Sequence, residues 1–146
     1  MRKYLILLIL IFGISDAKAQ YNCKVMTSDR ETVTFRVTGY GKKVKLATED
    51  AELSAVKTLC FIGAAGTSFR LPLVSQGQTK AEKDYSDFFD NFYGDNYRNF
   101  IETSSVVIPF GKDGEKRKCI TLDVRIRASQ LRTFLEQSGV IRKFGL

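Results

Sequence analysis

Few side chains in this chain could carry out catalysis. The sequence contains no histidine, which excludes a histidine-based triad, dyad or general base. Ser54 and Lys57 match the Ser-x-x-Lys spacing of some serine hydrolases, but they lie inside a predicted helix and no companion motif accompanies them. We therefore interpret this match as chance.

A group of carboxylates offers the other possible chemistry, because glycoside hydrolysis uses a pair of them. They lie on one predicted amphipathic helix, Lys80–Tyr93, whose opposite side is an aromatic stripe that we expect to be core. A solvated polar face explains such carboxylates better than an active site does. We expect a non-catalytic protein without a cofactor, and a hydrolase is a remote alternative. The carboxylates are Glu82, Asp84, Asp87 and Asp90.

The three cysteines, Cys23, Cys60 and Cys119, bear on metal binding and on cross-linking. Without histidine and without a Cys-x-x-Cys spacing, the sequence gives no support for a zinc site. An odd number leaves at least one thiol outside any internal disulfide. Cys60 falls in a predicted helix as a small buried group, so Cys23 and Cys119, both in strand-like stretches, are the possible disulfide.

The N-terminus has the three parts of a secretory signal peptide. A basic start is followed by the apolar run Tyr4–Ile14 and by Ala17-Lys18-Ala19, which is a small-x-small cleavage site. We therefore assign residues 1–19 to a signal peptide and expect a periplasmic or secreted protein with no stable membrane insertion after cleavage. The remaining charges are mildly basic and interspersed, which argues against nucleic-acid binding and leaves weak attraction to anionic envelope polymers possible.

Hydrophobic periodicity predicts one α+β domain over residues 20–146. Two hairpins should form an antiparallel sheet of about four strands, with helices packed on one face. The predicted strands are 22–26, 31–38, 104–110 and 117–127, and the predicted helices are 44–61, 80–93 and a closing helix between Ser129 and Gly139.

A strand that ends in Gly-x-Gly, a helix with alanine at every fourth position, and a later hairpin with a closing helix resemble a known envelope module. This is the N-terminal domain of flagellar assembly protein T and the related small lipoproteins of Gram-negative bacteria. The chain is also similar to secreted proteins of the Bacteroides group that have no assigned function. It departs from the flagellar pattern at Cys60–Gly63 and in the aromatic helix, and neither resemblance implies catalytic residues. The matching positions, within Glu31–Gly139, are Gly39, Gly41, Ala47, Ala51 and Ala55, with the strand Ile120–Ile126 as a second match.

These observations predict a non-catalytic exported envelope protein that acts as a protein-interaction or assembly module, with another envelope protein as its partner. A long unpaired sheet edge or an undocked C-terminal tail would favour this interpretation. The alternative is a small carbohydrate- or peptide-binding module built on the loop Gly63–Thr79, which an exposed cluster of Phe and Tyr would favour. The possible interaction residues are Tyr93, Tyr97, Arg142, Lys143 and Phe144.

Overall fold

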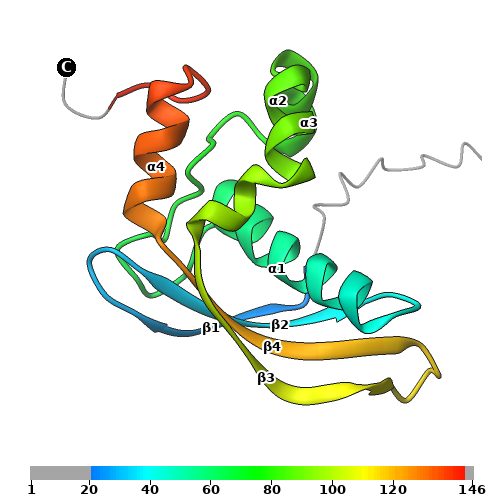
Figure 1. Cartoon of the computed structure of the whole chain (residues 1–146). Helices are drawn as coiled ribbons and strands as arrows, with labels where there is room; N and C mark the ends of the chain where they lie inside the picture. The colour runs from blue at the N-terminus through cyan, green and yellow to red at the C-terminus, as the bar shows by residue number, and fades with distance from the viewer. Residues whose placement is uncertain (1–20, 144–146) are drawn as a thin grey trace, which may run out of the picture.

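Residues 21–143 are the part of the chain that the computed structural model describes (Figure 1), and the predicted signal peptide at 1–19 lies outside them. Two strands come first, helices follow, and two strands and a helix close the chain. The elements are β1 (Cys23–Ser28), β2 (Val33–Tyr40), α1 (Val44–Phe61), α2 (Gln78–Asp84), α3 (Ser86–Gly94), a short 3-10 helix η1 (Asn96–Phe100), β3 (Ile101–Lys112), β4 (Lys118–Ile126) and α4 (Ala128–Gln137).

The four strands form one antiparallel sheet in the order β1-β2-β4-β3. Alternate residues of β2 and β4 point to the buried face, and Phe35 of β2 lies between Val25 of β1 and Val124 of β4. All helices lie on that face, while the opposite face is open (Figure 1). This arrangement confirms the predicted α+β fold, with about four strands from two hairpins. No helix within residues 21–143 has the length and apolar character needed to cross a bilayer.

The contact between α1 and β2 depends on the absence of side-chain bulk. Ala47 and Ala51 of α1 are fully buried against the end of β2. A Cβ atom placed on Gly39 would lie 2.1 Å from the carbonyl oxygen of Ala47 and 2.4 Å from the amide nitrogen of Ala51. Since both of these are backbone atoms, only glycine lets the helix come this close to the strand. The glycines and alanines noted in the sequence therefore serve helix–sheet packing.

The predicted helix 80–93 is two helices, because the backbone leaves helical geometry at Tyr85 (φ −124°, ψ 42°). The bend brings the Tyr93 hydroxyl to within 2.6 Å of Glu82 Oε1, to which it donates a hydrogen bond. In a straight helix these two positions would be about 16 Å apart along the axis, so the bond requires the bend. The aromatic stripe is core as expected, with Phe89 and Phe92 at most 2% exposed.

Candidate interaction surfaces

Cys23 and Cys119 are not positioned to form the predicted disulfide, and all three cysteines are free thiols. Cys23 on β1 pairs with Val37 on the buried face, whereas Cys119 on β4 pairs with Tyr40 on the open face. Strand β2 lies between them, which separates their backbones by about two strand spacings, or ~9.6 Å. A disulfide spans less than about 7 Å between Cα atoms, so strand order and side-chain direction both prevent it.

The thiols of Cys23 and Cys60 are also poor nucleophiles. Burial raises the pKa of the Cys23 thiol to about 11, against the opposing effect of a hydrogen bond to Thr58. Burial alone raises the pKa of the Cys60 thiol to about 12. Because the thiolate is the reactive form, neither side chain is activated for covalent chemistry.

Tyr93, predicted as an interaction residue, is used inside the protein. Its hydroxyl donates to Glu82, and the ammonium group of Lys57 lies 4.2 Å from the centre of its ring. Desolvation, followed by the hydrogen bond to Glu82, raises the pKa of Tyr93 above its ordinary value. This cluster joins α1, α2 and α3. It also places Lys57, the lysine of the Ser-x-x-Lys match, against the Tyr93 ring.

Tyr97 is likewise unavailable to a ligand. Its side chain is 2% exposed in η1, and the Arg98 guanidinium lies 5.7 Å from its ring centre. Arg98 in turn forms an ion pair with Glu49 at 2.8 Å. The exposed Phe and Tyr cluster that would favour carbohydrate binding therefore does not form at Tyr93 and Tyr97.

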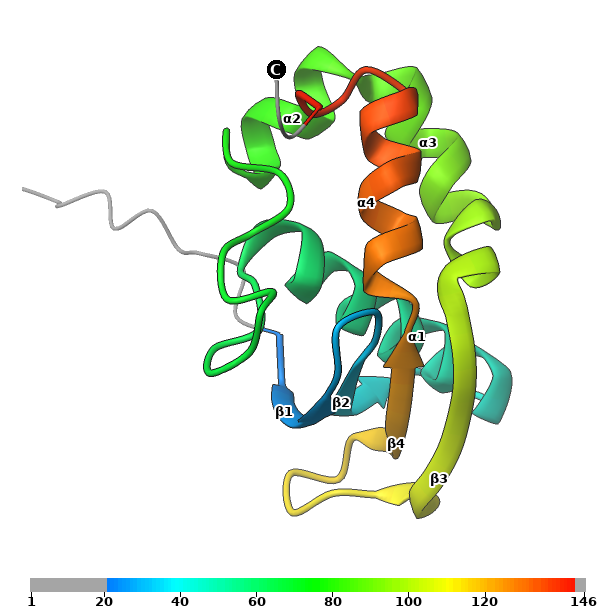
Figure 2. The same cartoon turned by 90° about the vertical axis from the view of Figure 1, so that its left-hand side faces the viewer.

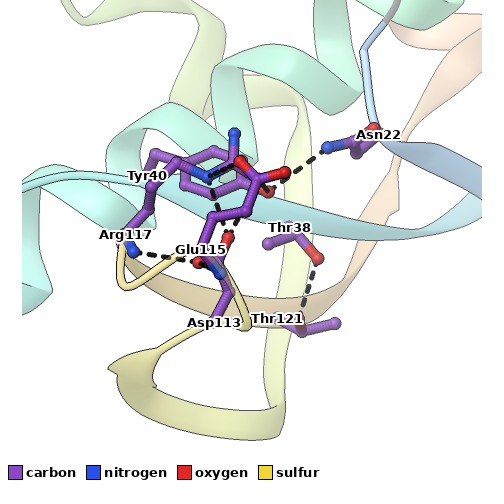
Figure 3. A network of polar contacts seen from close by, with 7 residues as sticks. All are labelled: Asn22, Thr38, Tyr40, Asp113, Glu115, Arg117 and Thr121. Atoms are coloured by element: carbon purple, nitrogen blue, oxygen red, sulfur yellow. Dashed lines mark hydrogen bonds and ion pairs between the residues drawn. The ribbon is translucent and has the colours of Figure 1, made fainter.

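The open face of the sheet is polar, and its arginines are paired with carboxylates. Figure 3 shows the end of this face, where Arg117 lies 4.5 Å from the Tyr40 ring centre and donates to Asp113 at 2.9 Å. Glu115 lies 3.4 Å from the same guanidinium. The pKa of the Asp113 carboxyl is lowered, and the largest cause is the hydrogen bond that it accepts from the backbone N–H of Arg117. Along the same face, Arg36 makes two bonds to Asp123, at 2.8 and 2.9 Å. These contacts hold the hairpin and the strands together, so this face has a structural role.

Strand β3 is the exposed edge of the sheet, and β4 is its only strand neighbour within residues 21–143. Val106 and Ile108 are 60% and 59% exposed, and Val107 is 38% exposed. No charged residue occurs from Thr103 to Gly111. An edge strand presents unpaired backbone N–H and C=O groups along one side, and here it presents apolar side chains as well.

A second surface is a groove of about 1340 Å³ between the loop before α2 and the end of α4. In Figure 2 the green loop lies beside α4, and the red segment after α4 turns toward the same side. Two predicted interaction residues, Arg142 and Lys143, line this groove together with Arg70 and Arg132. Phe144, the third predicted residue of the tail, lies outside the described residues.

The sequence indicated part of the groove, because the loop Gly63–Thr79 and the tail residues Arg142 and Lys143 were predicted interaction segments. The uncharged, β-branched run that ends at Pro109 was a signal for an edge strand, because Pro109 cannot donate to a ladder. Arg70 lies in that predicted loop, whereas Arg132 gave no signal, since it lines the groove only because the loop packs beside α4.

Comparisons of the chain with protein-family models, with curated proteins and with solved structures gave no match.

Proposed function

We propose that this chain is a non-catalytic protein-interaction module of the cell envelope, exported after removal of residues 1–19, and that it binds an extended segment of another envelope protein at the edge of β3. The single observation that carries the proposal is the exposed, uncharged edge of β3 from Thr103 to Ile108. Strand addition at such an edge gains backbone hydrogen bonds, and side-chain contacts give specificity.

The edge is best suited to a partner over a short stretch. Residues 103–106 pair with β4 without a break in register, whereas register shifts follow at Val106/Ile108 and Ile108/Gly111. Bulges and proline are among the features that block pairing at an edge strand. The second half of β3 has both, because it contains the register shifts and Pro109. The stretch Thr103–Val106, which follows Glu102, has no charged residue and no proline. We therefore expect the partner strand to lie along Thr103–Val106, so that Val107 stands at the end of this stretch.

A non-catalytic role agrees with the chemistry of the side chains. The sequence has no histidine, Lys57 is held on the Tyr93 ring, and Glu82 accepts hydrogen bonds from Tyr93 and Gln78. Lys57 and Glu82, two of the candidate catalytic groups, thus make contacts that stabilise the fold. Recognition by backbone pairing needs no such groups.

The test is a pull-down from envelope extract with three forms of the immobilised chain: wild type, Val107→Lys and Met26→Lys. A lysine on an exposed edge disfavours strand addition. Met26 is 37% exposed on β1, the opposite edge, so Met26→Lys adds the same charge at a matched exposure. Circular dichroism and thermal melting establish that all three forms are folded.

We expect one partner to be retained by wild type and by Met26→Lys and lost by Val107→Lys. Sedimentation of the purified chain distinguishes a second copy from a different protein as the partner. Equal retention by all three forms, or no retained partner, would overturn the proposal. N-terminal sequencing of the exported protein tests the accompanying prediction that it begins at Gln20.

A further inference from the structure

The groove beside α4 has two walls that are fixed by backbone hydrogen bonds. On one wall, the Val74 N–H donates to the Cys60 carbonyl at 2.8 Å, so the loop is attached to the last turn of α1. On the other wall, the Val140 N–H donates to the Leu135 carbonyl at 3.1 Å, which ties the segment after Gly139 to the end of α4. A groove held open in this way needs little reorganisation to accept a ligand, and this favours binding.

Close contacts also fix the loop at its start. Gly63 has φ +90°, and a Cβ atom there would lie 2.5 Å from the carbonyl oxygen of Arg70. Phe69 is 3% exposed and lies 5.3 Å from the Arg132 guanidinium, measured to the ring centre. The loop therefore packs on α4 through Phe69 and holds Arg70 at the groove.

The charge of the groove has one sign. Four cationic side chains line it, Arg70, Arg132, Arg142 and Lys143, and none of the lining residues is Asp or Glu. Within residues 21–143, no carboxylate lies within ion-pair distance of Arg70, Arg142 or Lys143. This contrasts with the open sheet face, where the arginines Arg36, Arg117 and Arg125 each have a carboxylate partner.

The groove also has an apolar part. Leu71 is 69% exposed, and it lines the groove together with Leu73, Val74 and Val140, which are nearly buried. A small inorganic anion would gain nothing from these apolar residues, because apolar contact requires a ligand with apolar groups. The hydroxyl and amide side chains of Ser68, Ser75 and Gln76 also line the groove and supply hydrogen-bonding groups of the kind that a peptide backbone uses.

We propose that this groove binds an extended peptide segment in which carboxylate side chains alternate with apolar ones. The volume of about 1340 Å³ exceeds the range of about 300–1,000 Å³ that is usual for compact small-molecule sites, which favours an elongated ligand. The carboxylates pair with Arg70, Arg142 and Lys143, and the apolar side chains pack on Leu71 and its neighbours. The site is independent of the β3 edge and takes a ligand of different chemistry.

The probe is a short fluorescein-labelled peptide in which Asp and Glu alternate with Leu and Val, and binding to the full chain is followed by fluorescence anisotropy. A control peptide carries Asn and Gln in place of the acids. We expect saturable binding of the acidic peptide only. Binding should weaken as ionic strength rises to about 0.2 M, because exposed ion pairs are screened by salt.

Three variants locate the site. Arg70→Glu should weaken binding about tenfold, which corresponds to about 1.4 kcal/mol. Arg30→Glu makes the same charge change at an exposed position in the β1–β2 turn and should leave the affinity unchanged. Leu71→Ser removes apolar contact without changing the charge and should weaken binding severalfold; since Leu71 is exposed, the fold should tolerate it.

Several results would overturn the proposal. Equal weakening by Arg70→Glu and Arg30→Glu would mean non-specific attraction to a basic protein. Equal affinity for the acidic and neutral peptides would exclude charge recognition. Binding of phosphatidylglycerol vesicles without binding of the peptide would identify a lipid surface instead. Val107→Lys should bind the peptide as wild type does, so the β3 proposal and this one can fail separately.

Discussion

Strands β2 and β3 lie on either side of β4, and both pair with it in the antiparallel sense. Their surroundings nevertheless differ. On β2, Val33, Phe35 and Val37 are at most 1% exposed, whereas on β3, Val106 and Ile108 are about 60% exposed. Both strands carry β-branched residues, so intrinsic strand preference does not separate them.

The difference comes from helix α1, which lies against β2 and reaches β3 at one polar contact. Ser104 on β3 donates a hydrogen bond to Glu52 of α1 at 2.7 Å. Helix α1 approaches β2 much more closely, because Gly39 has no side chain. Apolar residues on β2 therefore form the core, while those at the exposed end of β3 remain available to a partner. The comparison predicts that β2 determines stability and that β3 determines binding.

Hydrogen exchange should show the largest contrast between the two strands. Strand β2 has a neighbour on both sides, so its amides should exchange only by global unfolding, which costs about 5 kcal/mol or more. Every second amide along the Thr103–Val106 stretch of β3 should exchange with little or no opening cost. Exchange of the purified monomer, followed by mass spectrometry or NMR, checks this. Uniform protection of β3 at the level of β2 would mean that the edge is covered.

The next largest effect is expected from truncation of one apolar side chain on each strand. Phe35→Ala should lower the free energy of unfolding by about 4 kcal/mol, since it leaves a cavity between the sheet and α1. Ile108→Ala on β3 should change it by less than about 0.5 kcal/mol, because Ile108 is already exposed. Urea denaturation of both variants measures the difference. Similar losses at the two positions would contradict the assignment of β3 as a surface that the core does not need.

The contrast between β2 and β3 also shows which parts of the fold can be predicted from the sequence. Alternation on β2 and β4 and the alanine spacing of α1 predict the sheet and its covering helix, because burial imposes a period on each element. The bend at Tyr85 was not predictable, since the hydrogen bond of Tyr93 to Glu82 forms only in the folded chain. The strand order was not predictable either, and it prevents the predicted disulfide between Cys23 and Cys119, because β2 lies between them.

The candidate surfaces were harder to predict than the fold. That β3 is an edge follows from the order of the two hairpins, and a sequence of hairpins permits more than one order. The groove requires the loop that carries Arg70 to pack beside α4, which carries Arg132. The loop Gly63–Thr79 and the basic residues Arg142 and Lys143 were identified separately in the sequence, but their meeting with α4 was not. Binding surfaces made by distant segments leave no local pattern.

Close packing at the α1–β2 contact gives the third prediction. Gly39→Ala should lower the free energy of unfolding by about 3 kcal/mol, because its Cβ would overlap backbone atoms of α1 that can move only with the helix. Gly94→Ala is the matched control, since nothing lies within 4 Å of a Cβ atom there. Thermal melting of the two variants makes the comparison. A stable Gly39→Ala protein would show that α1 can shift away from β2.

The smallest effect is expected on the open face, where Arg36 of β2 binds Asp123 of β4 through two hydrogen bonds. The side chains are 40% and 28% exposed, so solvent screens the pair, and the coupling between Arg36→Gln and Asp123→Asn should be smaller than any effect above.

The pH dependence of the Arg36–Asp123 pair makes its contribution to stability measurable. The hydrogen bond from Arg36 lowers the pKa of the Asp123 carboxyl. A lowered pKa means that the folded state binds the proton more weakly than the unfolded chain does, so the stabilisation is present above the unfolded pKa of about 3.9 and is lost as the pH falls through the folded value. Wild type should therefore lose stability between neutral pH and about pH 3 more steeply than Asp123→Asn does. Parallel pH profiles would show that the pair contributes nothing to holding β2 against β4.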